Sequence, residues 1–354
     1  MAAPTVDPAF WSGRRVLVTG DTGFKGGWLS LWLHSMGAKV SGLALEPDQV
    51  PNFFTLTRLG ELIDHRTVDL RDRAATAAAV DAFDPELVLH LAAQPLVRES
   101  IRNPVDTFAS NVMGTVHLLE ALRGRAGLKG VLSVTSDKVY RNYDTGRPFV
   151  ETDPLGGTDP YSGSKAAAEC VAYSYGRSYF DRANVPTATA RGGNVVGGGD
   201  FSLDRLVPDL VRSIEAGDQL VLRHPNSTRP WQHVLDCVAG YLTHLQAICA
   251  DPSTPRALNF GPSDDVLPTV GEMATALCEK LGADQGWRHE PDPTSIEMKL
   301  LHIDASLSKS AIGFTPRLGS AAVIDLTAEW YRAYLGRTAD LRDFTLQQIA
   351  SYGH

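Results

Sequence analysis

The sequence lacks the features that mark membrane, secreted or nucleic-acid-binding proteins. No apolar run approaches the length of a membrane span, and residues 1–12 lack the basic and then apolar stretches of a secretory signal. The net charge of −8 shows no excess of basic residues, at the level of the whole chain, that would favour binding of nucleic acid. We therefore expect neither a membrane nor a nucleic-acid partner.

Cysteine is also scarce. The four cysteines, Cys170, Cys237, Cys249 and Cys278, lie far apart and form no CxxC pair. We therefore expect no metal site and no disulfide framework, and the cytoplasm is the expected compartment. Hydrophobic residues make up 43% and charged residues 21%, an ordinary globular balance, and 354 residues suggest two domains or one domain with an added lobe.

Strand and helix patterns alternate through the first half of the chain. Residues 14–19 form a short apolar, β-branched run that leads into a glycine turn, and Trp28–Met36 is apolar at helical spacing. The same alternation then continues with a strand over 39–45, a helix over 74–83, a strand over 87–91, a helix over 105–122 and a strand over 130–135. This order predicts an α/β fold, a Rossmann-type doubly wound parallel sheet with helices on both faces.

The second half is less regular. A long helix is expected over Ala166–Arg182 and a strand over Thr187–Ala190, followed by glycine- and proline-rich loops, a helix near 206–216 and an isolated strand near 219–222. We expect a dinucleotide-binding domain over residues 1–190. Residues 191–354 are expected to form mainly a smaller mixed α/β substrate lobe, with some segments returning to the first domain.

Gly20, Gly23 and Gly26 form GxxGxxG between the first strand and the first helix, with Phe24 and Lys25 inside the turn. In that context the glycines permit a tight turn, close approach of a pyrophosphate and close helix–strand packing. The second strand ends at Leu45, with Glu46 beyond it and no arginine for a 2′-phosphate, which favours NAD over NADP. Asp69-Leu70, after a third strand expected over 66–68, is a candidate for the adenine edge; a solvated turn aspartate is the alternative.

Tyr161 and Lys165 are four residues apart, so on a helix their side chains share a face. A tyrosine with an ordinary pKa near about 10 is a poor base at neutral pH, and a nearby ammonium lowers that value. Such a pair can take a proton from a hydroxyl as a hydride leaves. A surface helix pair is the alternative interpretation.

Ser136, Asp137 and Lys138 follow directly after the strand over 130–135, at the edge of the sheet that faces the ligand crevice. Ser136 is a candidate to hold a substrate hydroxyl, Asp137 to protonate a leaving hydroxyl, and a deprotonated Lys138 to take a carbon-bound proton. A simple dehydrogenase needs no such additional acid and base. The alternative is an aspartate–lysine pair that only caps the strand end.

Taken together, these motifs resemble the extended short-chain dehydrogenases that act on nucleotide sugars. Finer features resemble the 4,6-dehydratase branch of that family whose substrate is CDP-glucose, over almost the whole chain. The likeness rests on the glycine turn, His90-Leu91-Ala92-Ala93, Asn111, Ser136-Asp137-Lys138, Tyr161 with Lys165, Asp153-Pro154-Leu155-Gly156-Gly157, Arg191-Gly192-Gly193-Asn194, Gly197-Gly198-Gly199-Asp200, and Thr228-Arg229-Pro230-Trp231-Gln232-His233-Val234. The chain departs from the branch pattern at Val139, Gly163, Gly192 and Phe201, none of which is a reacting group.

The resemblance implies an internal redox cycle that turns CDP-glucose into a 4-keto-6-deoxy sugar nucleotide, with NAD as tightly held cofactor. In that cycle Tyr161 is the base tuned by Lys165, Lys138 removes the C5 proton, and Asp137 protonates the C6 hydroxyl. Cofactor contacts are further implied for Leu91, Ala92 and Ala93, and substrate contacts for Asn194, Arg205, Arg229 and His233. A homodimer or dimer of dimers, built from helices 105–122 and 166–182, is also implied. A 4-epimerase, a 4,6-dehydratase for another nucleotide hexose, and a cofactor-binding scaffold without turnover are the alternatives.

Overall fold

The computed structural model describes residues 6–143, 146–262, 267–291 and 302–353. Its centre is a sheet with the strand order β10-β6-β5-β4-β1-β2-β3, in which every pair is parallel. The order reverses between β1 and β4, which confirms the doubly wound Rossmann-type fold. The strands are β1 (Arg15–Thr19), β2 (Lys39–Ala44), β3 (Asp64–Thr67), β4 (Leu87–His90), β5 (Gly130–Val134), β6 (Thr187–Gly192) and β10 (Ala257–Phe260).

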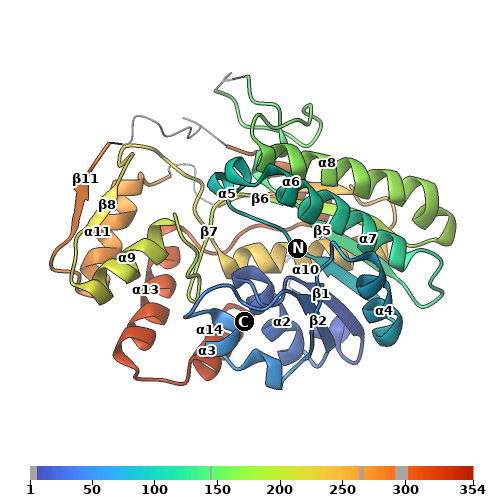
Figure 1. The fold of residues 1–354 in the computed structure, drawn as a ribbon, viewed down its shortest axis with the longest axis horizontal. Coiled ribbons are helices and arrows are strands. Elements are labelled where there is room, and N and C mark those ends of the chain that lie inside the picture. The colour runs from blue at the N-terminus through green and yellow to red at the C-terminus, as the bar shows by residue number, and fades with distance from the viewer. Residues whose placement is uncertain (1–5, 144–145, 263–266, 292–301, 354) are drawn as a thin grey trace.

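Helices cover both faces of this sheet, as Figure 1 shows. Successive side chains of β1 point to opposite faces: Val16 and Val18 join the core beneath α2 (Phe24–Ser35) and α10 (Val234–Ala250). Leu17 joins the core on the other face, beneath α4 (Arg73–Phe83), α7 (Gly114–Leu122) and α8 (Pro160–Tyr175). Because both faces are buried, the central strands are almost uniformly apolar.

A smaller lobe lies beside the carboxyl edge of the sheet, at the left of Figure 1. It contains α9 (Leu206–Ala216), β8 (Leu220–Leu222), α11 (Val270–Leu281) and β11 (Trp287–His289), and β8 pairs with β11 in parallel. Beyond residue 190, however, β10 and α10 still belong to the main sheet and its cover. The division at residue 190 stays a prediction.

The shorter elements are α1 (Pro8–Trp11), α3 (Phe53–Leu56), α5 (Val97–Arg102), α6 (Pro104–Phe108), β7 (Val195–Val196), β9 (Gln232–His233), α12 (Ser306–Ile312), α13 (Ser320–Gly336) and α14 (Leu341–Gly353). No helix in the described part of the chain is both long and apolar enough to cross a membrane.

Two helices begin earlier than the sequence pattern predicted, and both corrections concern the site. The helix expected from Ala166 begins at Pro160, because the Asp159 carboxylate accepts a hydrogen bond from the backbone N–H of Ser162 at 3.0 Å. It therefore includes both residues of the tyrosine–lysine pair. The helix expected from Trp28 begins at Phe24, directly after the second glycine of the turn. The helix expected over 105–122 contains a π-helical segment at Ala109–Met113.

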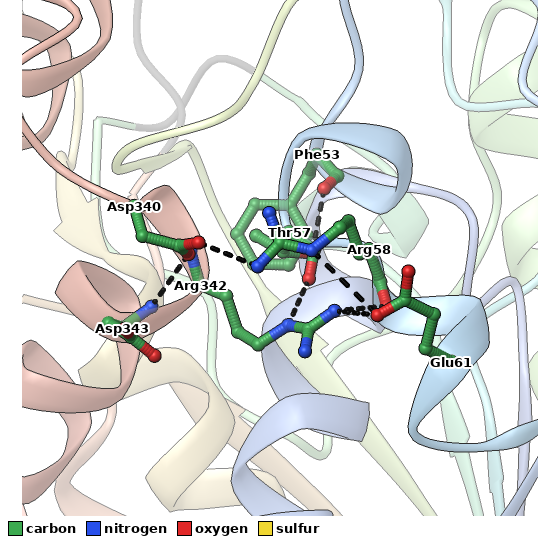
Figure 2. Close-up of polar contacts among 7 residues, drawn as sticks. All are labelled: Phe53, Thr57, Arg58, Glu61, Asp340, Arg342 and Asp343. Atoms are coloured by element: carbon green, nitrogen blue, oxygen red, sulfur yellow. Dashed lines mark hydrogen bonds and ion pairs between the residues drawn. The ribbon is translucent and has the colours of Figure 1, made fainter.

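The C-terminal segment returns to the first half of the chain through a group of ion pairs, drawn in Figure 2. Arg58, just after α3, pairs with Asp340 at 2.6 Å. Arg342 pairs with Glu61 at 2.6 Å and donates to the carbonyl of Thr57 at 2.7 Å. These contacts attach the start of α14 to the segment that follows α3.

Candidate active site

The glycine turn forms a cradle that a larger residue would fill. Gly20 has a φ of +80°, and a Cβ at Gly26 would lie 2.0 Å from the carbonyl oxygen of Gly20. Gly23 begins α2 without a side-chain cap, so the first N–H groups of the helix are open to an anion. The turn therefore fits the pyrophosphate of a dinucleotide.

The ends of β1 and β4 meet at the reversal point of the sheet. A Cβ at Gly20 would lie 2.8 Å from the backbone nitrogen of Ala92, and that N–H donates to Thr19 Oγ1 at 3.1 Å. His90 lies beneath, hydrogen-bonded to Thr19, and burial followed by the nearby Lys165 charge lowers its pKa to about 3. The structure thus places Leu91 and Ala92 directly against the glycine turn; contact of Leu91, Ala92 and Ala93 with the cofactor stays a prediction.

At the adenosine end, Asp69 and Leu70 follow β3. The Asp69 carboxylate forms an ion pair with Arg71 at 2.7 Å, and hydrogen bonding from Arg71 lowers its pKa. Glu46, beyond β2, accepts a hydrogen bond from Thr67. Contact of Asp69 and Leu70 with the adenine stays a prediction.

Tyr161 and Lys165 lie in the first turns of α8, buried against the end of β5. The Lys165 ammonium donates to the carbonyl of Val134 at 3.2 Å. Burial, followed by the charge of Lys25, lowers the pKa of Lys165 to about 7. Lys165 therefore loses its charge close to neutral pH.

Ser136, Asp137 and Lys138 form one compact group after β5. Asp137 Oδ1 accepts from Ser136 Oγ at 3.0 Å and from Lys138 Nζ at 3.4 Å. The other oxygen, Oδ2, is buried and has no hydrogen-bond partner among the described residues. A Cβ at Gly193 would lie 3.1 Å from that oxygen, so the second glycine of the Arg-Gly-Gly-Asn segment leaves room for it.

The structure brings this group together with Tyr161. Burial alone would lower the pKa of Lys138. The charges of Asp137 and Tyr161 outweigh that effect, so the pKa of Lys138 is raised. Burial raises the pKa of Tyr161 overall, and the Lys138 charge and a hydrogen bond with Ser136 offset only part of that rise. Lys138 is therefore a cation that acts on Tyr161 in this structure, and the tuning role expected for Lys165 stays a prediction.

A buried ion pair behind the site was missed in the sequence. Glu169 and Arg191 pair at 2.8 Å with side chains only 4% exposed. Glu169 also accepts from Thr135 and Thr189, and Arg191 donates to the Tyr140 hydroxyl at 2.8 Å. The pair therefore ties α8 to the ends of β5 and β6. The sequence did contain one signal for this pair, an acidic residue one helical turn after Lys165.

The substrate lobe contributes two arginines near these groups. Arg205 pairs with Asp200 at 2.7 Å and is among the charges that lower the pKa of Tyr161. Arg229 donates to the carbonyl of Thr228 at 2.9 Å and is among the charges that lower the pKa of Lys138. Both cations therefore act on the catalytic candidates from the opposite lobe, where a phosphate would be held by charge-assisted hydrogen bonds.

Asn194 directly precedes β7 and His233 lies in β9, the two short strands that pair with each other. The backbone carbonyl of Asn194 accepts from Gln232 at 2.9 Å, beside the β7–β9 pairing. His233 is fully buried and caps α10, because its Nδ1 accepts from the Leu235 N–H at 3.2 Å, and burial lowers its pKa to about 3. Direct contact of either side chain with a substrate stays a prediction.

Comparison with known proteins gives consistent results. Residues 16–261 match the NAD dependent epimerase/dehydratase family. The chain is 40% identical to the CDP-glucose 4,6-dehydratase of Salmonella typhimurium, over 98% of both proteins. It is 30% identical to a dTDP-glucose 4,6-dehydratase of Xanthomonas campestris pv. campestris, over 89% of this chain and 92% of that one. Among solved structures, the UDP-glucose 4-epimerase of Thermus thermophilus in complex with NAD is 26% identical, covers 90% of this chain and 99% of its own, and has a TM-score of 0.76.

Proposed function

This chain belongs to the NAD dependent epimerase/dehydratase family, and on that basis we propose that it converts CDP-D-glucose into CDP-4-keto-6-deoxy-D-glucose as an NAD-dependent 4,6-dehydratase. The observation that carries the proposal is the Asp137–Lys138 pair, which lies beside Tyr161. Oxidation of a hydroxyl needs the tyrosine and a cation, whereas loss of water needs a further acid and base. A 4-epimerase has no use for that second pair.

The glycine turn fits the pyrophosphate of the cofactor, and Leu91 and Ala92 lie against it. When bound there, NAD supplies the hydride acceptor for C4 oxidation and the hydride donor that later reduces C6, so it ends unchanged. Tyr161, charge-stabilised by Lys138, takes the proton of the C4 hydroxyl, and Ser136 orients that hydroxyl. The resulting C4 ketone acidifies the hydrogen on C5.

Elimination then needs Asp137 as an acid and Lys138 as a base. In the resting pair, however, Asp137 is the unprotonated anion and Lys138 the protonated cation. The Nζ–Oδ1 hydrogen bond of 3.4 Å offers the route, because one proton moved from Lys138 to Asp137 makes both groups neutral. Lys138 then accepts the C5 proton, and Asp137 gives its proton to the departing C6 hydroxyl, which leaves as water. Lys138 finally gives a proton back to C5 and is itself reprotonated by the proton that Tyr161 took from the C4 hydroxyl, so all three residues finish in their starting forms.

A panel of nucleotide hexoses tests the proposal. Purified protein is incubated with CDP-glucose, dTDP-glucose, UDP-glucose and GDP-mannose, and the 4-keto product is read by its absorbance in alkali. We expect the fastest turnover with CDP-glucose. Faster turnover of another nucleotide sugar would overturn the cytidine assignment alone, and a 4-epimer without keto product would overturn the dehydratase assignment.

Arg229 is proposed to hold the substrate diphosphate. Loss of one charge-assisted phosphate contact costs about 1.5–3 kcal/mol, so Arg229→Ala is expected to weaken CDP-glucose binding roughly ten- to hundredfold. NAD affinity should stay unchanged, because the glycine turn lies in the other lobe. Calorimetric titration measures both affinities, and Arg288→Ala, on β11 of the same lobe, is the control. Loss of NAD affinity in the Arg229 variant would contradict the assignment.

We also propose a homodimer formed through the helices of one sheet face. On this side α6, the π-helical segment before α7, and α8 expose large apolar side chains: Val105, Phe108, Met113 and Tyr173. An exposed apolar surface of this kind favours self-association. Light scattering at micromolar concentration should give twice the chain mass, and Phe108→Glu should shift it toward the monomer. A monomer mass for the unmodified protein would rule out the dimer.

The compartment proposed is the cytoplasm. All four cysteines are free thiols, and Cys170 is exposed on α8. Exposed free thiols are typical of proteins that work in a reducing environment.

A further inference from the structure

The glycine turn contains a buried acid. Asp21 directly follows Gly20, and its side chain is fully buried. Asp21 Oδ2 is 2.6 Å from His65 Nδ1, and Oδ1 has no hydrogen-bond partner among the described residues. His65 lies on β3, two strands away from the β1 end that carries the turn. A buried carboxylate is costly unless an opposite charge compensates it, so this contact matters to the turn.

The strand between them leaves space for this contact. Gly42 on β2 is the register partner of His65, and a Cβ at Gly42 would lie 2.1 Å from Asp21 Oδ2. Even an alanine at that position would displace the carboxylate, because contacts that short do not occur. The turn after β1 therefore supplies the acid, β2 leaves the space, and β3 supplies the base.

Two further acids act on His65, and one of them, Asp64, is itself paired with Arg66 at 2.8 Å. Glu46 after β2 and Asp64 on β3 act on it in addition to Asp21, while the ring of Phe54, on α3, covers it at 4.8 Å between centroids. The hydrogen bond to Asp21 raises the pKa of His65, against the opposite effect of burial. The surroundings thus favour the imidazolium form.

We propose that His65 is a positioning residue for the cofactor: as an imidazolium it neutralises Asp21 and holds the turn from Gly20 to Gly23 in the form that receives the NAD pyrophosphate. The proposal rests on NAD binding at this turn. His65 itself need not touch the cofactor, because it acts through Asp21, which is adjacent in sequence to the first glycine. Neutral His65 would leave Asp21 with an uncompensated charge close to an anionic ligand.

The sign of the resulting pH dependence follows from the raised pKa of His65 in the folded protein. The contribution of such a group is complete at low pH and is lost as pH rises through its folded-state pKa. Above that pH the turn loses its internal ion pair, and the remaining negative charge repels the pyrophosphate. Both effects weaken NAD binding, by about three- to tenfold for one uncompensated charge that repels an anionic ligand.

Calorimetric titration of NAD into the full-length protein, from about pH 5.5 to about pH 9, tests this inference. The unmodified protein and His34→Gln, which removes a histidine near the far end of α2, should both lose affinity as pH rises. His65→Gln should bind weakly at every pH, and Asp21→Asn should bind with little pH dependence. Adding Asp21→Asn to His65→Gln should restore affinity, because it removes the uncompensated charge.

The outcomes separate this inference from the proposed function. No NAD binding by the unmodified protein at any pH would contradict the function itself. NAD binding that is independent of pH, or a His65→Gln protein that binds like the unmodified one, would overturn the inference alone. A double variant no better than His65→Gln would also overturn it, because a purely structural role for His65 gives that result.

Discussion

Lys138→Ala should abolish dehydration, with a loss of about 10²–10⁴-fold, while oxidation at C4 survives in part. The variant removes the group that takes the C5 proton but keeps Tyr161 and Asp137. Because the Lys138 charge lowers the pKa of Tyr161, its loss should also move the pH profile of the remaining oxidation to higher pH.

Exchange of the C5 hydrogen with solvent deuterium, followed by nuclear magnetic resonance, measures the proton-abstraction step directly. Lys129→Ala is the matched control, because Lys129 lies just before β5 whereas Lys138 lies just after its other end. The control should exchange at the unmodified rate. Unmodified C5 exchange in Lys138→Ala would show that another group is the base.

Glu169→Ala should lower the free energy of unfolding by about 3–5 kcal/mol, the largest stability effect expected for a single substitution near the site. The variant leaves the Arg191 guanidinium buried without its carboxylate, and it also removes the acceptor of Thr135 and Thr189. Because these contacts join α8 to β5 and β6, the catalytic side chains on both elements lose their common support.

Urea unfolding measures this effect. The matched control is Arg123→Ala, which breaks the partly exposed Arg123–Glu120 pair at the end of α7 and should cost far less than Glu169→Ala. Replacing Glu169 and Arg191 together by leucine should recover part of the loss, since no unpaired charge then remains buried. A cost for Glu169→Ala as small as that of the control would contradict the account of this pair.

Local sequence signals predicted the parts of the site that depend on neighbours in the chain. The apolar run before Gly20 and the residues after β5 were assigned correctly to strand ends, because strand, turn and helix patterns repeat over a few residues. The helix that carries Tyr161 was predicted to begin too late. Its start depends on the Asp159 side chain and on Pro160 as its first residue, signals that the apolar periodicity does not contain.

Contacts between distant residues could not be predicted in the same way. Asp21 and His65 are 44 residues apart, and Arg58 and Asp340 are 282 residues apart. In the sequence all four are ordinary polar residues. The folded sheet brings Asp21 and His65 together, and the returning C-terminal segment brings Asp340 to Arg58. The same holds for Gly42: its lack of a side chain matters only because the Asp21 carboxylate, from the turn after β1, occupies the space.

Conversion of CDP-glucose carrying deuterium at C4, in ordinary water, tests the central claim most directly. An internal redox cycle removes the label from C4 and delivers it to C6 of the same molecule, while Lys138 and Asp137 handle only protons. We expect a 4-keto-6-deoxy product with deuterium in its methyl group. Recovery of a 4-epimer that still carries deuterium at C4, with no keto sugar formed, would contradict the account.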